Sequence, residues 1–211
     1  MSTRGRPRAF DREQALQTAL IIFWEKGYDL TQVVDLTTAM GIKPPSFYAA
    51  FGSKQAAFNE AIDLYLRTAG SKTIHVLEHT PQVKDAIRAM LTESIHTAMD
   101  APAGGCLLVL GLIHRTPDNA QLCQRLEDIR RSNVDSIRSR VQRGAQEGEL
   151  DAVHVEGLTQ LIATVLQGLS LRARDGATRG ELELAVQAAM GVFEAVAGGK
   201  SGHHRPRRKL A

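Results

Sequence analysis

The segment from residue 31 to residue 54 predicts two short helices joined by a tight turn. Thr31 suits the N-cap of the first helix, because its hydroxyl can accept a hydrogen bond from an otherwise unpaired backbone N–H. Gly41 ends that helix, since glycine adopts positive φ without steric cost. Pro44 and Pro45 begin the second helix, where a missing N–H breaks no hydrogen bond. This pattern is typical of a helix-turn-helix, whose second helix enters the major groove of DNA.

Apolar residues recur at helical spacing along the rest of the chain, and no segment shows the sustained alternation of a strand. The sequence therefore predicts an all-α protein. The pair Gly70-Ser71 interrupts one long helix and is a candidate pivot. The segment from Cys106 to Ile113 is apolar on every side, which predicts a short buried helix. The expected helices span about residues 11–26, 32–40, 44–50, 54–79, 81–99, 106–113, 118–146, 153–174 and 179–197.

Basic side chains are concentrated at the two ends of the chain. Of the 26 lysines and arginines, eight lie within residues 1–8 and 198–211, which hold no acidic residue. The remaining residues carry 18 basic and 23 acidic side chains, so cationic arms flank an acidic body. The run Arg4-Gly-Arg-Pro7 resembles an AT-hook, in which arginines such as Arg4 and Arg6 enter the minor groove of A·T-rich DNA. A disordered tail attracted to phosphate fits these residues equally well, and the C-terminal arm also fits a solubilising end.

Nothing in the sequence predicts export or insertion into a membrane. No apolar run reaches the roughly 18 residues of a membrane span, and the N-terminus lacks the apolar region of a secretory signal. We therefore expect a cytoplasmic protein without a membrane partner. Two cysteines, Cys106 and Cys123, are too few for a disulfide framework, and a reducing compartment disfavours a bridge between them.

The helix-turn-helix residues carry a family resemblance. The run Gly41-Ile-Lys-Pro-Pro-Ser-Phe-Tyr-Ala-Ala-Phe-Gly-Ser-Lys54, followed by Ala56-Ala-Phe58, resembles the signature of the TetR/AcrR family of bacterial transcriptional regulators. One departure is Lys43, where family members often carry a capping Ser or Thr. The resemblance implies a three-helix DNA-binding domain and a six-helix ligand-binding and dimerisation domain, flanked by basic tails. The expected boundaries are 9–69, with the helix-turn-helix at about 32–51, then 70–198, with tails at 1–8 and 199–211.

The resemblance also implies which residues contact DNA. Phe47 and Phe51 are expected to pack the small core, and the other face of the recognition helix to meet the DNA. This face has no Arg, Asn or Gln, so contacts with thymine methyls and DNA shape would carry much of the specificity. The expected base or backbone contacts are Lys43, Pro44, Pro45, Ser46 and Ala49, and the expected phosphate contacts are Tyr48, Lys54 and Thr31, with Arg4 and Arg6 on the arm.

An effector pocket is expected between the helices that follow residue 54. An apolar cavity with a few polar groups suits a small amphipathic molecule. The helix faces give these candidate lining residues: Tyr65, Met90, Ser94, Cys106, Leu110, His114, Leu126, Leu161 and Val165.

Cys106 supports a second hypothesis. A thiol at a helix N-terminus has a lowered pKa and reacts more readily with electrophiles and oxidants. The chain would then be a cysteine-based electrophile or redox sensor with the same DNA-binding end. A small buried hydrophobic residue explains the same position, and Cys123 is expected to be structural.

No enzyme motif is convincing. His75 and His79 lie four residues apart and could bind zinc, and the string HxxEH matches the inverted zincin pattern, but short patterns recur by chance. We expect no catalysis, no metal and no cofactor, and an enzyme bearing a helix-turn-helix is a distant alternative. The favoured interpretation is a repressor released from a pseudo-palindromic operator by a small molecule. Its dimer interface would be a four-helix bundle formed by residues 153–174 and 179–197 of two subunits.

Overall fold

The computed structural model describes residues 11–198. This part of the chain is helical and contains no strand, which confirms the all-α prediction. Two 3-10 turns, Pro117–Asn119 and Ala152–His154, precede the two long helices α8 and α9. None of the described helices is long and apolar enough to cross a membrane. The helices are α1 Arg12–Leu30, α2 Val33–Met40, α3 Pro44–Phe51, α4 Lys54–Arg67, α5 Ala69–His79, α6 Val83–Asp100, α7 Leu107–Leu110, α8 Ala120–Gln146, α9 Val155–Arg174 and α10 Arg179–Gly198.

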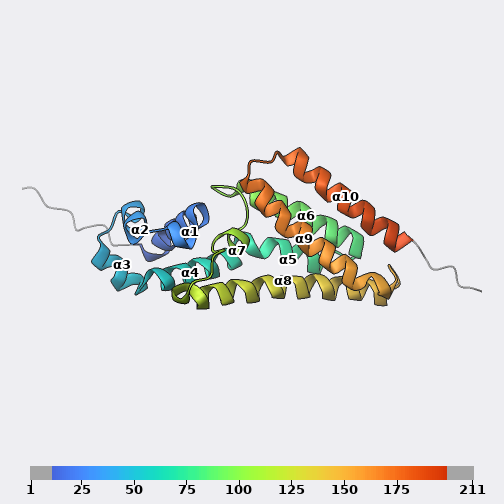
Figure 1. The fold of residues 1–211 in the computed structure, drawn as a ribbon, viewed down its shortest axis with the longest axis horizontal. Coiled ribbons are helices and arrows are strands. Elements are labelled where there is room, and N and C mark those ends of the chain that lie inside the picture. The colour runs from blue at the N-terminus through green and yellow to red at the C-terminus, as the bar shows by residue number, and fades with distance from the viewer. Residues whose placement is uncertain (1–10, 199–211) are drawn as a thin grey trace, which may run out of the picture.

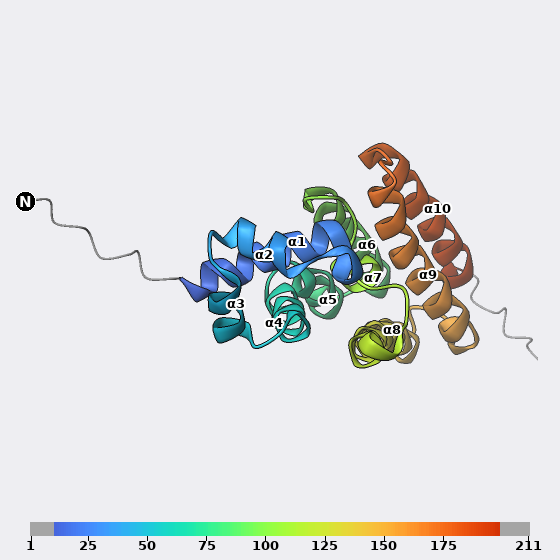
Figure 2. The same cartoon turned by 60° about the vertical axis from the view of Figure 1, so that its left-hand side comes forward.

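The molecule is elongated, with α1 to α4 at one end and the longer helices at the other (Figure 1). α8 runs along one edge of the molecule (Figure 1), and α9 packs against it, with α10 beside α9 on the side away from α8 (Figure 2). α6 packs against α5, α9 and α10 and so occupies the middle of the larger part. The short helix α7 lies where the two parts meet, because it contacts α1, α4, α8 and α9.

Two clusters of buried side chains hold these parts together. In the first, Phe23 of α1 meets Phe58 of α4 edge-on, with ring centroids 4.9 Å apart. This cluster extends beyond the first four helices, since Leu107 and Leu122 are buried in it. The second cluster joins α5, α6, α9 and α10 to the distal half of α8. Apolar burial of this kind stabilises the fold, and the shared first cluster couples α1 to α7 and α8 mechanically.

The long helix predicted over residues 54–79 is broken, but not where the sequence suggested. The break lies at Thr68, with φ −120° and ψ −100°, so the predicted interruption at Gly70-Ser71 is wrong in position. Gly70 lies inside α5, where a Cβ atom would come within 2.6 Å of the Tyr65 ring. Glycine at this position therefore makes room for a buried aromatic ring.

The predicted helix over residues 106–113 is also wrong in length. Only Leu107–Leu110 is helical, and Ile113 is 66% exposed rather than buried. Beyond α7 the chain turns back to α1, because the Gly111 carbonyl accepts a hydrogen bond from the Tyr28 backbone N–H at 2.7 Å. Gly27 lets α1 meet this segment: its φ of 74° interrupts the helix next to the Gly111 carbonyl.

Candidate DNA-binding surface and effector cavity

The helix-turn-helix forms at the molecule's end, and α3 has one buried and one exposed face. Gly41 ends α2 in the left-handed region with φ 66°, and Pro44 occupies the first position of α3. Phe47 and Phe51 are buried, as predicted, with ring centroids 5.3 Å apart. The residues predicted to face DNA share the opposite, exposed surface: Lys43, Pro44, Pro45, Ser46, Tyr48 and Ala49.

The exposed face of α3 is mainly small and apolar, with two groups able to bind phosphate. Tyr48 is 50% exposed, and its ring rests edge-on against Phe47 at 5.6 Å. Lys43 is the exposed N-cap residue of α3. The first two helical residues are prolines without an N–H group, and the N–H groups of Ser46 and Phe47 donate to the Lys43 carbonyl. The exposed Lys43 ammonium is a cation that can contact a phosphate. The face therefore suits phosphate contacts better than direct base readout.

Thr31 does not cap the first helix of the motif, so that prediction is wrong. Its side chain is buried, and its hydroxyl donates to the Gly27 carbonyl at 2.6 Å. The N-cap of α2 is Gln32, whose backbone N–H donates to the Asp35 carboxylate at 2.8 Å. A hydrogen bond from Lys26 lowers the pKa of Asp35. The Thr31 hydroxyl thus holds the chain after the Gly27 break, and a phosphate contact from Thr31 stays a prediction.

Lys54 has internal partners that the sequence did not reveal. Its ammonium donates to the carbonyls of Tyr28 and Thr31 at 3.0 and 2.9 Å. It also lies 4.2 Å from the centroid of the Tyr28 ring. Partial burial lowers the pKa of the Lys54 ammonium. The side chain therefore ties the start of α4 to the end of α1, and its contact with phosphate stays a prediction.

Replacing Lys54 by alanine is expected to lower the free energy of unfolding by about 1–2 kcal/mol. The two carbonyls lose a charged donor, and partial exposure keeps the loss in the lower part of the usual range. Urea denaturation followed by circular dichroism measures the change. Lys43→Ala is the matched control, because its exposed side chain makes no such bonds and the change should stay within about 0.5 kcal/mol. Equal stability of the two variants would contradict the internal role of Lys54.

A cavity lies in the larger part, bounded by α4 to α9. Its free volume of about 70 Å³ is small beside the roughly 300–1,000 Å³ of a drug-sized ligand site. Three of the predicted lining residues do line it: Tyr65, Ser94 and Cys106. Most of the cavity wall was not predicted from the sequence: Gly70, Thr73, Ile74, Thr97, Ala98, Leu108, Val109, Arg130, Asn133, Val134, Ile137, Ala163, Leu166, Gln167 and Ser170.

The other six predicted lining residues lie elsewhere. Met90 and Leu126 are fully buried in the two hydrophobic clusters, so they fill the core rather than a cavity. His114 is exposed on the segment after α7, which is extended there instead of helical. Leu110, Leu161 and Val165 also do not line the cavity. Helix faces alone could not show how α8 and α9 are rotated about their axes.

Cys106 faces a different environment from the one predicted. Its sulfur lies 3.1 Å from the Tyr65 hydroxyl, and its backbone N–H donates to the Ser170 hydroxyl at 2.7 Å. Burial raises the pKa of the Cys106 thiol, so the predicted lowering is wrong. Burial likewise raises the pKa of Tyr65 well above its ordinary value. The helix that follows Cys106 has only four residues, and desolvation outweighs any effect of its end.

Direct hydrogen bonds join the cavity wall to the DNA-binding end. The Trp24 indole N–H donates to the Gly105 carbonyl at 3.0 Å. Arg174, at the end of α9, donates to the Trp24 and Gly104 carbonyls at 2.9 and 3.0 Å. Gly104 and Gly105 directly precede Cys106 of the cavity wall, so these hydrogen bonds link α1 and α9 to the backbone next to the cavity.

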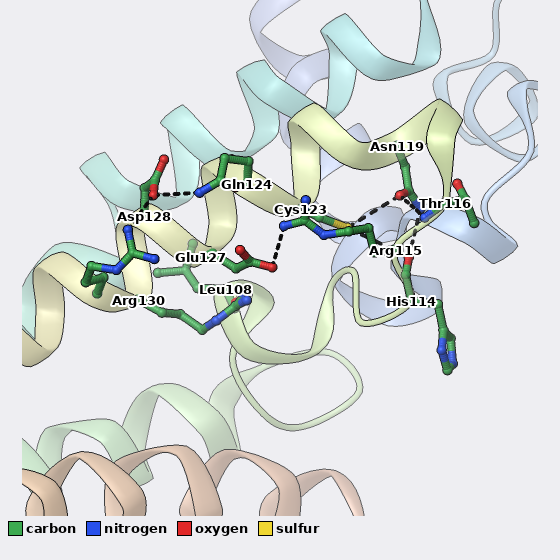
Figure 3. A network of polar contacts seen from close by, with 11 residues as sticks. Leu108, His114, Arg115, Thr116, Asn119, Cys123, Gln124, Glu127, Asp128 and Arg130 are labelled. Carbon is green, nitrogen blue, oxygen red and sulfur yellow. Dashed lines mark hydrogen bonds and ion pairs between the residues drawn. The ribbon is translucent and has the colours of Figure 1, made fainter.

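A second set of polar contacts fixes the start of α8 (Figure 3). The Asn119 amide donates to the His114 carbonyl at 2.9 Å and to the Asp29 carboxylate at 3.2 Å. Its oxygen accepts from the backbone N–H of Thr116 and from the Cys123 thiol. Asn119 and Cys123 are buried, so these contacts tie the end of α1 to α8.

Two further predictions concern metal binding and the tails. His75 and His79 stack with ring centroids 4.1 Å apart, and the described residues hold no group of three or more His, Cys, Asp or Glu side chains placed to bind a metal. Arg4, Arg6 and the C-terminal basic tail lie outside the described residues, so their predicted DNA contacts stay predictions.

Comparison with known proteins gives a consistent answer. Residues 15–61 match the family described as bacterial regulatory proteins, tetR family. The HTH-type transcriptional repressor BdcR of Escherichia coli is 30% identical over 174 residues, covering 82% of this chain and 83% of BdcR. The repressor ComR of the same organism is 29% identical over 183 residues, covering 83% of this chain and 85% of ComR.

Solved structures agree with these relatives. A cysteine-substituted form of the TetR family regulator CifR, complexed with 26-bp operator DNA, is 38% identical. It superposes with a TM-score of 0.83 over 89% of this chain and all of that chain. A TetR regulator from Chloroflexus aurantiacus, 25% identical, superposes with a TM-score of 0.76 over 86% and 93% of the two chains. The helix-turn-helix, the all-helical architecture and these similarities together show that the chain belongs to the TetR family of transcriptional regulators.

Proposed function

We propose that the protein is a cytoplasmic repressor that binds a pseudo-palindromic operator as a homodimer and leaves it when a small molecule enters the cavity. The observation that carries the proposal is the exposed face of α3, held outward by buried Phe47 and Phe51. The names of ComR and BdcR as repressors, and the operator complex of CifR, support the same function here. The proposed DNA-binding and effector domains are residues 9–69 and 70–198, and no catalysis is proposed.

An unpaired apolar surface on α9 and α10 supports the homodimer. Leu171, Leu184 and Val192 are 51%, 64% and 49% exposed on these two adjacent helices, and an exposed apolar surface there suits contact with a second copy. Gly168 and Gly191 have open space around them, so a second pair of helices could approach closely. Two copies of this pair would form a four-helix interface and place the two α3 helices symmetrically.

The contacts between cavity and α1 support release by an effector. A ligand that favours one arrangement of Gly105 and Cys106 would also favour one position of Trp24. A shift of Trp24 would move α1 and α4, and so would change the spacing of the two α3 helices in a dimer. The proposed pivot is the break at Thr68 between α4 and α5.

A second candidate function keeps Cys106 as a covalent sensor. The observation in its favour is the thiol in the cavity wall, next to the Tyr65 hydroxyl. Iodoacetamide would form a carbon–sulfur bond as iodide leaves and the thiol loses its proton. Operator release by iodoacetamide from the wild type, with none from Cys106→Ser, would support this function. Equal responses of the two proteins would exclude it.

The proposed function is tested by DNA binding of the full chain. A gel-shift with the DNA upstream of its own gene should give one retarded complex that resists excess unrelated DNA. Sedimentation of the complex should give two chains per DNA duplex. If unrelated DNA at a mass equal to that of the probe abolishes the retarded complex, the proposal is contradicted.

A further inference from the structure

Arg130 is the charged residue in the cavity wall, and it has no acidic partner among residues 11–198. Three of the other five arginines of α8 pair with a carboxylate, whereas Arg140 and Arg143 donate to backbone carbonyls away from the cavity. Arg125 pairs with Asp63, Arg131 with Asp128 and Arg138 with Asp135. The described residues that line the cavity include no Asp or Glu. The cavity wall therefore carries one positive charge that no carboxylate of the wall compensates, and this charge favours an anion.

The hydrogen bonds of Arg130 leave one edge of its guanidinium for a ligand. Nη1 donates to the Leu108 carbonyl at 2.6 Å (Figure 3). Among the described residues no acceptor is bonded to Nε or Nη2. Those two N–H groups point in parallel from one edge of the planar group, which is the arrangement that binds both oxygens of a carboxylate.

The rest of the wall sets the size and polarity of the ligand. Ile74, Val134 and Leu166 give apolar contacts, while Asn133 and Gln167 add polar groups. A free volume of about 70 Å³ accommodates only a few heavy atoms beyond a carboxylate unless side chains move. A short aliphatic tail matches this wall better than a sugar or a nucleotide.

We propose that the effector is a small aliphatic carboxylate whose two oxygens bind Nε and Nη2 of Arg130. This inference rests on the proposed function, since it names the ligand class of the same cavity. Arg130 also holds the Leu108 carbonyl, and α7 leads to Gly111, which accepts the hydrogen bond from Tyr28. Pairing at Arg130 would thereby act on the segment that contacts α1.

The test is thermal unfolding of the full chain with defined probes. Sodium butanoate, hexanoate and octanoate are compared with the alcohols of equal chain length, at ionic strength held constant with sodium chloride. Sodium phosphate is a further probe, which tests whether any anion raises Tm. The variants are Arg130→Gln and Arg130→Lys, with Arg131→Gln as the control because Arg131 is exposed and pairs with Asp128 outside the cavity.

At least one carboxylate should raise Tm of the wild type and of Arg131→Gln, while the alcohols and phosphate should not. Arg130→Gln should need about tenfold more carboxylate or a larger excess for the same shift, as expected for a lost charge-assisted pair. Arg130→Lys keeps the charge and should respond at an intermediate concentration. If Arg130→Gln fails to fold, the comparison of Arg130→Lys with the wild type still tests the role of Arg130.

Three results would overturn the inference: no shift with any carboxylate, equal shifts with alcohols and carboxylates, or equal responses of wild type and both Arg130 variants. A gel-shift on the same wild-type preparation distinguishes failure of this inference from failure of the proposed function. If the operator is still bound while carboxylates have no effect, only the ligand class is wrong. If the operator is not bound at all, the proposed function itself fails.

Discussion

Replacing Tyr48 by alanine is expected to weaken operator binding by about ten- to a hundredfold while leaving the chain folded. Tyr48 is half exposed on the face of α3 that carries no strong base-reading side chain. A hydroxyl that donates to a phosphate contributes as a hydrogen bond to a charged group, about 1.5–3 kcal/mol. Since few other groups on this face can bind DNA, the loss should not be masked.

Fluorescence anisotropy with labelled operator DNA measures the effect. Tyr48→Phe is the matched control, because it removes the hydroxyl and keeps the ring against Phe47. An equal loss in both variants assigns the effect to the hydroxyl, and a loss only in Tyr48→Ala assigns it to the ring. Unchanged affinity of Tyr48→Ala would remove Tyr48 from the DNA-binding surface.

Replacing the adjacent residue, Phe47, should reduce the stability of the fold, whereas replacing Tyr48 should reduce DNA affinity. Phe47→Ala is expected to lower the free energy of unfolding by about 3–5 kcal/mol, the usual cost of deleting a buried aromatic ring. Phe47 is fully buried and packs on Phe51, so α3 loses its attachment to the rest of the motif. Urea denaturation of the full chain measures the change.

Tyr48→Ala is the control for this experiment, and its stability should change by less than about 1 kcal/mol. A loss of less than about 1 kcal/mol in Phe47→Ala would mean that α3 is held by other contacts. The free energies of unfolding of Phe47→Ala and Tyr48→Ala would then not distinguish the buried face of α3 from the exposed face.

Local rules predicted the helix-turn-helix well. Gly41 and Pro44 mark helix ends through their own backbone restrictions, which do not depend on distant residues. The burial of Phe47 and Phe51 follows from helical spacing on one short helix. The all-α class likewise follows from periodicity summed over many residues.

Features set by distant contacts could not be predicted. Lys54 binds a carbonyl 26 residues earlier in the chain, and Ser170 binds a backbone N–H 64 residues earlier. The break at Thr68 lies between two helices whose packing fixes it, and no glycine or proline stands at that position. Arg130 looks like one of several surface arginines until α8 is placed against the cavity.

Cys106 shows how two physical effects compete. Its place before a helix favours the thiolate, whereas burial beside Tyr65 favours the neutral thiol. Only the tertiary structure reveals that the helix has four residues and that the sulfur is desolvated. Burial therefore outweighs the effect of the helix end, and the lowered thiol pKa predicted from the sequence is wrong.

The central claim is that two α3 helices of a dimer enter successive major grooves of one operator. DNase I footprinting of the DNA upstream of the chain's own gene tests it most directly. We expect two protected half-sites related by pseudo-two-fold symmetry, with centres about 10 bp apart or slightly more. Protection of a single half-site without a symmetric partner, or no protection at concentrations that saturate the gel-shift, would contradict it.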